Sequence, residues 1–431
     1  MEAAKRKITS VCYIFDLTRR QKRKLWFCFY TILMALAFFR IFCYIQDNQV
    51  RGIDVTSPDV FPLNPTKLIL VYTPYPFEPW GPKNAEEAKS YKFTDWDGTP
   101  CEETRCQITF DKALRNVSDA VLVHYAPAFN PSFNIEEIKR LNRPYAQRWV
   151  LYTKECPGVG PMGSKADGAY NWTATYRRDS DFFVPYGSYA PMEIKNGAVD
   201  ITEDGETSDQ KTEPAAEVQP DNTLNYARGK DKMVTFGVSR HCALRGPRFA
   251  FVRALMKHME VSLFGKCASQ FESNNTWHYP RHMGGGCLEE LQRHKFYLAF
   301  ENNLCIDYIT EKYWRNSLER GLVPIVLGGA SYSPEQVIPG SFINVADFDS
   351  VEALADYLKY LDKNDTAYNQ YFEWKTKYKI VKPQFWLCQL CKALHDPTKP
   401  PKTYHKMSEF WGIKESCHIG EERIWDIINR G

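Results

Sequence analysis

The stretch Phe296–Gly328 reads FYLAFENNLCIDYITEKYWRNSLERGLVPIVLG. Its apolar start predicts a buried strand, and three polar residues, Glu-Asn-Asn, follow the strand directly. Thr310 is a good helix N-cap and Gly321 a good terminator, so we expect a helix over Thr310–Arg320. The run VPIVLG predicts a second buried strand. A strand, a helix and a strand in this order predict a parallel α/β fold.

The same alternation continues on both sides of this stretch. Short apolar runs predict buried strands, and the segments between several of them have helical patterns. The expected strands are Lys67–Thr73, Ala120–Tyr125, Arg148–Thr153, Met233–Ser239, Val261–Gly265, Lys295–Asn302 and Val323–Gly328. The expected helices are Ile135–Leu141, Arg248–Met259, Thr310–Arg320 and Asp349–Leu361. Two such domains facing a cleft would bind a ligand at the carboxyl ends of their strands.

An acidic segment divides the two groups of strands. Residues 191–222 contain nine Asp/Glu, two Lys and no aromatic residue, which predicts an exposed loop or linker. We therefore expect the body to be organised as follows: a first α/β domain at 67–190, a linker at 191–230, a second Rossmann-like domain at 231–395 and a C-terminal extension at 396–431.

The N-terminal region predicts a membrane anchor. Residues 25–45 read LWFCFYTILMALAFFRIFCYI, and about 20 such residues cross a bilayer. The basic residues 1–24 favour a cytosolic tail, and the proline-containing residues 46–66 favour a stem. A signal peptide cleaved near residues 35–37 (Ala-Leu-Ala) is the alternative.

The charge distribution excludes one class of function. The net charge is +3, but residues 1–24 carry +6 and Arg40 adds one more, which leaves −4 on residues 46–431. An acidic body argues against nucleic-acid binding, which needs a basic footprint. The 44% of apolar residues fits a globular protein.

Cysteines and sequons agree with a lumenal body. Ten cysteines lie beyond residue 45, and an even number in an oxidising compartment predicts disulfides. Cys101 with Cys106, and Cys388 with Cys391, are candidates for closing small loops. A zinc site of Cys388, Cys391, Cys417 and His418 is the alternative. Candidate N-glycosylation sites are Asn116, Asn171, Asn274 and Asn364.

Three charged residues are candidates for chemistry. Lys312, beside Glu311 in the first turn of the expected helix, opposes the helix dipole, which suggests a bound anion such as a phosphate. Arg248 opens the first helix of the second domain, so the two cations could grip a diphosphate; Arg240 and Arg245 are equally suited. Glu155 follows a strand in RWVLYTKECPG and could accept a proton from a hydroxyl. Ordinary surface roles for these groups stay open.

Three segments resemble a known family. Phe296–Gly328, the block NWTATYRRDSDFFVPYG at 171–187 and the pair YFEWKTKYKI and FWLCQLC are similar to signatures of the α1,3-fucosyltransferases, glycosyltransferase family 10. The resemblance covers roughly residues 65–395. It implies a GT-B fold with two Rossmann-like domains, and transfer of L-fucose from GDP-fucose to a GlcNAc 3-hydroxyl with inversion. It also implies a single-pass type II protein of the Golgi membrane with no essential metal; stimulation by Mn²⁺ and a homodimer stay open.

The resemblance also implies roles for single residues. Glu155 matches the general base, and Arg248 and Lys312 match cations that bind the diphosphate of GDP. Glu311 matches a glutamate that supports the charged transition state, while two donor-contacting positions match Asn302 and Tyr308. The base motif departs from the family's Glu-Ser-Pro, because Cys156 replaces the serine. Residues 74–147 match poorly, so the acceptor, an N-glycan core, an antenna or a lipid, stays open.

Two other functions are consistent with parts of the sequence. A metal-dependent GT-A transferase would hold Mn²⁺ through an Asp-x-Asp triplet, which occurs at 95–97, 179–181 and 347–349. A catalytically inactive, glycan-binding relative would bind sugars without turnover. The charged residues matching the family's site argue against the second alternative.

Overall fold

The computed structural model describes residues 66–73, 81–125, 134–160, 162–192, 224–238, 242, 246–271, 276–277 and 285–430. They belong to one compact unit, Pro65–Gly431. No helix within these ranges has the length and apolar character needed to cross a bilayer. The expected tail, membrane span and nearly all of the stem lie outside the described residues, as do Arg240, Arg245, Asn274 and most of the acidic linker.

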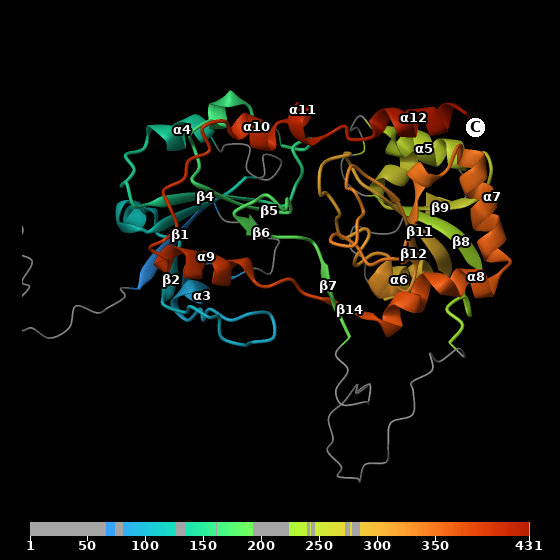
Figure 1. The fold of residues 1–431 in the computed structure, drawn as a ribbon, viewed down its shortest axis with the longest axis horizontal. Coiled ribbons are helices and arrows are strands. Elements are labelled where there is room, and N and C mark those ends of the chain that lie inside the picture. The colour runs from blue at the N-terminus through green and yellow to red at the C-terminus, as the bar shows by residue number, and fades with distance from the viewer. Residues whose placement is uncertain are drawn as a thin grey trace, which may run out of the picture. The chain divides into compact units, whose positions relative to one another are not determined.

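The first sheet has six parallel strands. Its order is β2 (Cys106–Thr109), β1 (Lys67–Thr73), β3 (Ala120–His124), β4 (Arg148–Thr153), β5 (Trp172–Thr175) and β6 (Phe182–Phe183) (Figure 1). The three strands expected from the sequence are confirmed to within one residue. The short strands β2, β5 and β6 were not expected, because two to four residues carry too little periodicity.

The second sheet is also six-stranded and parallel. Its order is β10 (Thr276–Trp277), β9 (Val261–Phe264), β8 (Lys232–Gly237), β11 (His294–Phe300), β12 (Val323–Leu327) and β13 (Ile343–Asn344). Every residue of β11 is buried, as is typical of a central parallel strand covered on both faces. The polar residues that follow β11 therefore lie at the carboxyl edge of the sheet, where Glu301 and Asn302 are still buried.

Helices cover the two sheets, and one small antiparallel sheet pairs β7 (Ser188–Pro191) with β14 (Tyr378–Val381). The helices are α3 (Ala85–Lys89), α4 (Ile135–Arg140), α5 (Pro247–Leu255), α6 (Gly285–Gln292), α7 (Val351–Asp362), α8 (Asp365–Asn369), α9 (Trp386–His395), α10 (Met407–Trp411), α11 (Ile413–Ser416) and α12 (Glu421–Asn429). Short 3₁₀ turns lie at Lys112–Val117, Ser164–Ala166, Lys266–Gln270, Leu318–Arg320, Val345–Asp347 and Gln370–Thr376. The expected helices at Ile135–Leu141, Arg248–Met259 and Asp349–Leu361 are confirmed, each somewhat shorter.

The helix expected over Thr310–Arg320 is wrong for most of its length. Only Leu318–Arg320 is helical, as a 3₁₀ turn, and Gly321 ends it with φ +69° as expected. Backbone N–H groups of Asn316, Leu318 and Glu319 donate to carbonyls five residues earlier, at 2.8, 3.3 and 3.1 Å. Tyr313 and Trp314 are both buried in this segment.

Helix α9 lies against the first sheet. Two disulfides fix α9 to this sheet: Cys106–Cys391 joins it to β2, and Cys101–Cys388 joins it to the segment before β2. The expectation that each pair closes a small local loop is therefore wrong. Residues three apart on a helix share one face, so both cysteines meet the neighbouring segment instead of each other. From the sequence, residues 231–395, and so α9, are assigned to the second domain. In the structure α9 packs against the first sheet instead.

The remaining disulfides also correct the sequence analysis. Cys242 bonds to Cys267 and Cys305 to Cys417, so the zinc site with Cys388, Cys391, Cys417 and His418 is wrong. Among the cysteine side chains that the structure describes, only Cys156 keeps its thiol. The C-terminal extension reaches both sheets: Trp411 is buried in a first-sheet cluster, and α12 contacts α5 beside the second sheet (Figure 1).

The described sequons differ in accessibility. Asn116 is exposed and Asn364 is half-buried, with its Oδ1 capping α8. Asn171 instead accepts a bond from the Trp149 N–H at 2.8 Å and donates through Nδ2 to the Lys402 carbonyl at 2.8 Å. A glycan on that nitrogen would compete with this contact. The folded structure therefore disfavours Asn171 as an attachment site.

Candidate active site

The first candidate group, Glu155, lies on the loop that leaves the carboxyl end of β4. Its side chain is half-buried, at the edge of the sheet. Gly158 lets this loop touch the loop that follows β11, because a Cβ at that position would lie 2.4 Å from the side chain of Asn303. The carboxyl ends of the two sheets therefore meet at this place.

A buried thiol holds the two loops together. Cys156 donates to Asn302 Oδ1 at 3.5 Å and accepts from Asn303 Nδ2 at 3.4 Å. Burial raises the pKa of the Cys156 thiol to about 12, and the nearby carboxylate of Glu155 adds to the shift. The thiol therefore stays protonated at neutral pH, so Cys156 is a positioning residue and not a nucleophile.

The second loop contains a buried ion pair. Glu301, 1% exposed, accepts from the Thr310 N–H at 2.8 Å and the Thr310 hydroxyl at 3.0 Å. Lys312 Nζ donates to Glu301 at 3.1 Å, to the Thr310 hydroxyl at 2.8 Å and to Glu311 at 3.3 Å. This network, and not an α-helix, fixes the Thr-Glu-Lys segment.

The pKa shifts follow from burial and from this pairing. Burial alone would lower the pKa of Lys312, but the carboxylates of Glu301 and Glu311 outweigh it and raise that pKa. Burial raises the pKa of Glu301 despite the attraction of Lys312. For Glu311 the attraction of Lys312 outweighs burial, and the pKa falls. Lys312 is therefore charged at neutral pH.

Tyr308 connects the two loops across the site. Its hydroxyl donates to Glu155 Oε2 at 3.5 Å, and its ring lies 4.7 Å from the ring of Tyr176. Arg248 is buried at the start of α5, which lowers its pKa, while Glu301 and Tyr308 oppose that shift electrostatically. The structure thus gathers the predicted residues Glu155, Tyr308, Asn302, Arg248 and the Glu311–Lys312 pair around the two carboxyl edges.

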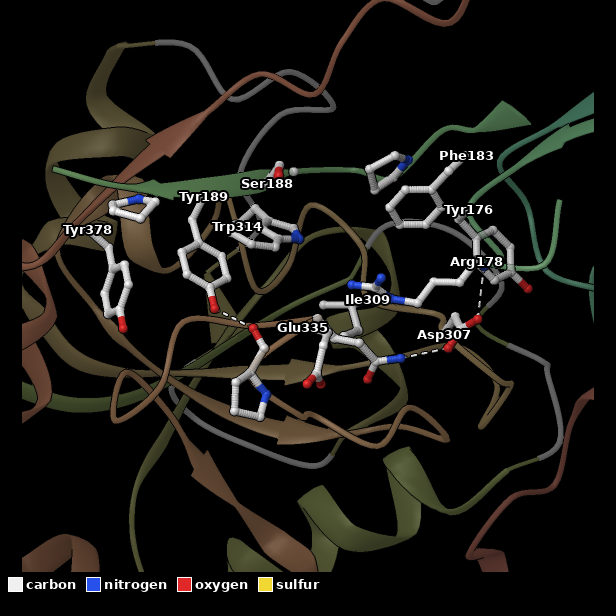
Figure 2. A pocket seen from close by; sticks show the side chains of 15 residues that line it. Tyr176, Arg178, Phe183, Ser188, Tyr189, Asp307, Ile309, Trp314, Glu335 and Tyr378 are labelled. Carbon is white, nitrogen blue, oxygen red and sulfur yellow. Dashed lines mark hydrogen bonds between the residues drawn. The ribbon is translucent and has the colours of Figure 1, made fainter. Parts of the chain in front are cut away.

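Sequence reasoning missed two residues that build this site. From the sequence, Glu301 is identified only as a polar residue after a strand. A carboxylate directly after a fully apolar strand, with a lysine soon after, is the signal that points to it. Asp307 was not noticed. It has a left-handed backbone (φ +58°) and accepts from the Arg178 N–H at 3.0 Å and from Gln336 Nε2 at 2.6 Å (Figure 2).

Two of the three Asp-x-Asp triplets, at 95–97 and 179–181, make structural contacts. Asp179 forms a two-bond ion pair with Arg177, and Asp181 accepts from the Thr173 N–H at 2.9 Å and from Lys402 Nζ at 2.8 Å. Asp95 accepts from the Phe385 N–H at 3.2 Å. Within the described ranges, the one cluster close enough to ligate a metal is Cys106, Cys391 and His395, and its cysteines form a disulfide. These contacts do not favour the GT-A alternative.

Comparisons with known proteins agree with this architecture. The family model "Fucosyltransferase, N-terminal" matches residues 64–187, and "Glycosyltransferase family 10 (fucosyltransferase) C-term" matches residues 227–411. "Glycoprotein 3-alpha-L-fucosyltransferase A" of Drosophila melanogaster is 31% identical over 372 residues, 84% of this chain and 64% of the relative. Human "4-galactosyl-N-acetylglucosaminide 3-alpha-L-fucosyltransferase FUT6" is 33% identical over 84% of this chain and 89% of the relative.

A solved structure gives a weaker match. A crystal structure of an alpha1,3-fucosyltransferase with GDP-fucose covers 82% of this chain and 96% of that chain, at 18% identity and a TM-score of 0.44. A likeness of this size does not position any residue of the site.

Proposed function

This chain belongs to glycosyltransferase family 10, the fucosyltransferases, and on that premise we propose that it transfers L-fucose from GDP-fucose to the 3-hydroxyl of a GlcNAc residue in glycoprotein or glycolipid glycans. One observation carries the proposal for this site. The Tyr308 hydroxyl, from the loop after β11, lies 3.5 Å from the Glu155 carboxylate, from the loop after β4. This contact joins the proposed base to the segment that also carries Lys312.

Glu155 acts as the general base in this proposal. The acceptor oxygen attacks C1 of fucose, and the bond from C1 to the phosphate oxygen breaks with its electron pair leaving on GDP. The proton of the acceptor hydroxyl passes to Glu155. Attack on the face opposite the leaving group inverts the configuration, as in inverting glycoside chemistry. The half-buried position of Glu155 supports this role, because it combines access with partial desolvation.

Two cations stabilise the leaving diphosphate. Lys312 carries its charge into the site on a rigid network, and Arg248 approaches from the start of α5. Lys312 already bonds to three oxygens, so a diphosphate would replace the longest of these contacts, that to Glu311 at 3.3 Å. Glu311 then lies near the sugar, where its carboxylate supports positive charge developing on the fucose ring. Asn302 and Tyr308 contact the donor.

The cellular setting is part of the same proposal. Residues 25–45 anchor a type II protein in the Golgi membrane, and the body lies in the lumen. Four disulfides support an oxidising compartment. No metal is required for transfer, because the two cations supply the charge that a metal would otherwise provide.

The test uses the purified chain with GDP-fucose and two acceptors, a core N-glycan glycopeptide and a LacNAc oligosaccharide. Released GDP and product mass are followed with and without EDTA. We expect transfer to at least one acceptor at a rate that EDTA does not abolish. Complete loss in EDTA would overturn the metal-independent mechanism. GDP-fucose binding without transfer to either acceptor would instead indicate a catalytically inactive relative.

A further inference from the structure

A cavity of about 390 Å³ lies beside the candidate active site. Its lining includes Tyr176, Arg178, Tyr189, Trp314, Glu335 and Tyr378 (Figure 2). The volume is within the range of about 300–1,000 Å³ that small-ligand sites occupy. None of the functions assigned to the catalytic residues uses this space.

The lining combines flat apolar surfaces with polar side chains. The rings of Tyr189 and Tyr378 meet edge to face with centroids 5.1 Å apart. The indole of Trp314 is 3% exposed and is covered by the backbone at Gly187, so Tyr189 and Tyr378 supply the accessible rings. Aromatic faces bind the C–H surfaces of sugars, and hydroxyls need donors and acceptors around them. The cavity therefore has the chemistry of a sugar site.

The charged residues of the lining are Arg178, Asp307 and Glu335, which are one cation and two carboxylates. Arg178 contributes to lowering the pKa of Glu335, after the hydrogen bonds of Glu335 to Ser333 and to its own N–H. A lining with one more negative than positive charge favours a neutral ligand with many hydroxyl groups over an anionic one. A nucleoside diphosphate is therefore a poor occupant, and an uncharged oligosaccharide a good one.

The cavity is directed toward the catalytic base. In Figure 2 the labelled side chains extend from Tyr378 and Tyr189 at one end to Tyr176 and Asp307 at the other. The Tyr176 ring contacts the Tyr308 ring at 4.7 Å, and Tyr308 bonds to Glu155. One side chain, that of Tyr308, thus lies between the Tyr176 end and Glu155, and the end with Tyr189 and Tyr378 is remote from Glu155.

We propose that this cavity binds the acceptor oligosaccharide beyond the reacting GlcNAc, with Tyr189 and Tyr378 holding a neutral sugar at its remote end. The inference rests on the proposed fucosyl transfer and deepens it, since it names the surface that selects among acceptors. Ser188 and Tyr189 lie on β7, and Tyr378 lies on β14, so the small antiparallel sheet supports this remote end.

The test compares acceptor kinetics of the purified chain and of Tyr378→Ala. The acceptors are a GlcNAc monosaccharide glycoside and whichever oligosaccharide the unmodified chain uses. We expect the KM for the oligosaccharide to rise about five- to tenfold, from loss of one aromatic contact. The KM values for the monosaccharide and for GDP-fucose should stay unchanged. Tyr378→Phe keeps the ring and should restore the oligosaccharide KM.

One control and one second variant distinguish loss of a sugar contact from general damage to the fold. Tyr145→Ala removes the same side chain at a position that is 85% exposed and outside the cavity lining, and should change none of the constants. Glu335→Gln changes an exposed acceptor in the cavity with little risk to folding, and should raise the oligosaccharide KM about two- to fivefold.

An unchanged oligosaccharide KM in both Tyr378→Ala and Glu335→Gln would overturn the inference. An equal rise for both acceptors, or a rise in the KM for GDP-fucose, would also overturn it, because the cavity would then not distinguish the distal sugar. Failure of the unmodified chain to transfer fucose to any acceptor is a different result. It would overturn the proposed function, and this inference with it.

Discussion

Glu155 and Glu301 follow buried parallel strands in the two sheets, yet their surroundings differ. Glu301 comes immediately after β11, is fully enclosed and accepts bonds from Thr310 and Lys312. Glu155 comes two residues after β4, stays half-buried and lies 3.5 Å from a tyrosine hydroxyl. The first carboxylate belongs to a satisfied network, and the second keeps access to the space between the loops.

The difference in surroundings gives the two carboxylates different roles, a structural one for Glu301 and a proposed catalytic one for Glu155. A buried carboxylate whose oxygens already accept from three donors can fix the position of Lys312, but it is closed to a substrate hydroxyl. A carboxylate at the edge of a sheet can be reached by a hydroxyl. The same residue type at equivalent strand ends therefore serves as an anchor in one sheet and as the proposed base in the other.

The largest expected effect comes from Glu155→Gln. The substitution keeps size and hydrogen bonding but removes the basic oxygen, so kcat should fall by about 10²–10⁴-fold. Binding of GDP should be unchanged, because the group acts on the acceptor side. Steady-state transfer assays and titration calorimetry with GDP measure the two quantities.

Glu137→Gln provides the matched control for this prediction. Glu137 is exposed on α4 in the same domain, so the identical chemical change there should leave kcat unaltered. A near-normal kcat in Glu155→Gln would show that Glu155 and Glu301 do not differ in the proposed way, and that another group removes the proton.

Lys312→Met tests whether the Glu301–Lys312 pair stabilises the fold. Without the ammonium, Glu301 loses the cation to which it is hydrogen-bonded, and breaking a buried ion pair from one side costs about 3–5 kcal/mol. The free energy of unfolding should fall by that amount in denaturant titrations. The double variant Glu301→Gln with Lys312→Met should recover most of the stability but not the affinity for GDP.

Recovery of stability without recovery of binding is the decisive pattern. It would separate the structural role of the pair from the role of Lys312 in holding the diphosphate. If the double variant binds GDP as tightly as the unmodified chain, Lys312 has only the structural role. If the single variant unfolds like the unmodified chain, the pair is not the anchor inferred from its burial.

Much of the fold was predictable because the strands are buried on both faces. Runs such as those of β1 and β4 have no competing interpretation, and their boundaries agree with the structure. The short strands β2, β5 and β6 and the helix α9 were not predicted, because their positions depend on partners distant in sequence. The Thr-Glu-Lys segment has the caps of a helix, but the bonds of Glu301 to Thr310 and Lys312 hold it in another conformation.

The site was predictable only in part. Charged residues at strand ends identified Glu155, Lys312 and Arg248, since the carboxyl edge of a parallel sheet is where such groups meet. The contact of Cys156 with Asn302 depends on how two loops approach, which no local pattern encodes. Glu301 has a local signal, because it follows a fully apolar strand directly, but its bonds to Thr310 and Lys312 depend on how the next segment folds back.

The smallest expected effect tests a feature that both sheets share. His124 ends β3 and His294 begins β11, and burial lowers the pKa of these imidazoles to about 3 and about 4. Both are neutral in the folded chain at pH 5, whereas the unfolded chain takes up protons below its ordinary pKa of about 6.5. The free energy of unfolding should therefore be highest above pH 6.5. It should fall by about 1–2 kcal/mol per histidine between pH 6.5 and 5.

The measurement is the free energy of unfolding as a function of pH for the unmodified chain, His124→Gln and His294→Gln. Each substitution removes the uptake of one proton on unfolding. It should therefore reduce the slope of the free energy of unfolding between pH 6.5 and 5 by at most about 1.4 kcal/mol per pH unit, whatever its effect on the absolute stability. The matched control is His405→Gln, at an exposed position, which should leave the slope as it is. A slope that changes for one histidine only would mean that the two sheets do not exclude protons equally, since the other imidazole would then be charging while the chain stays folded.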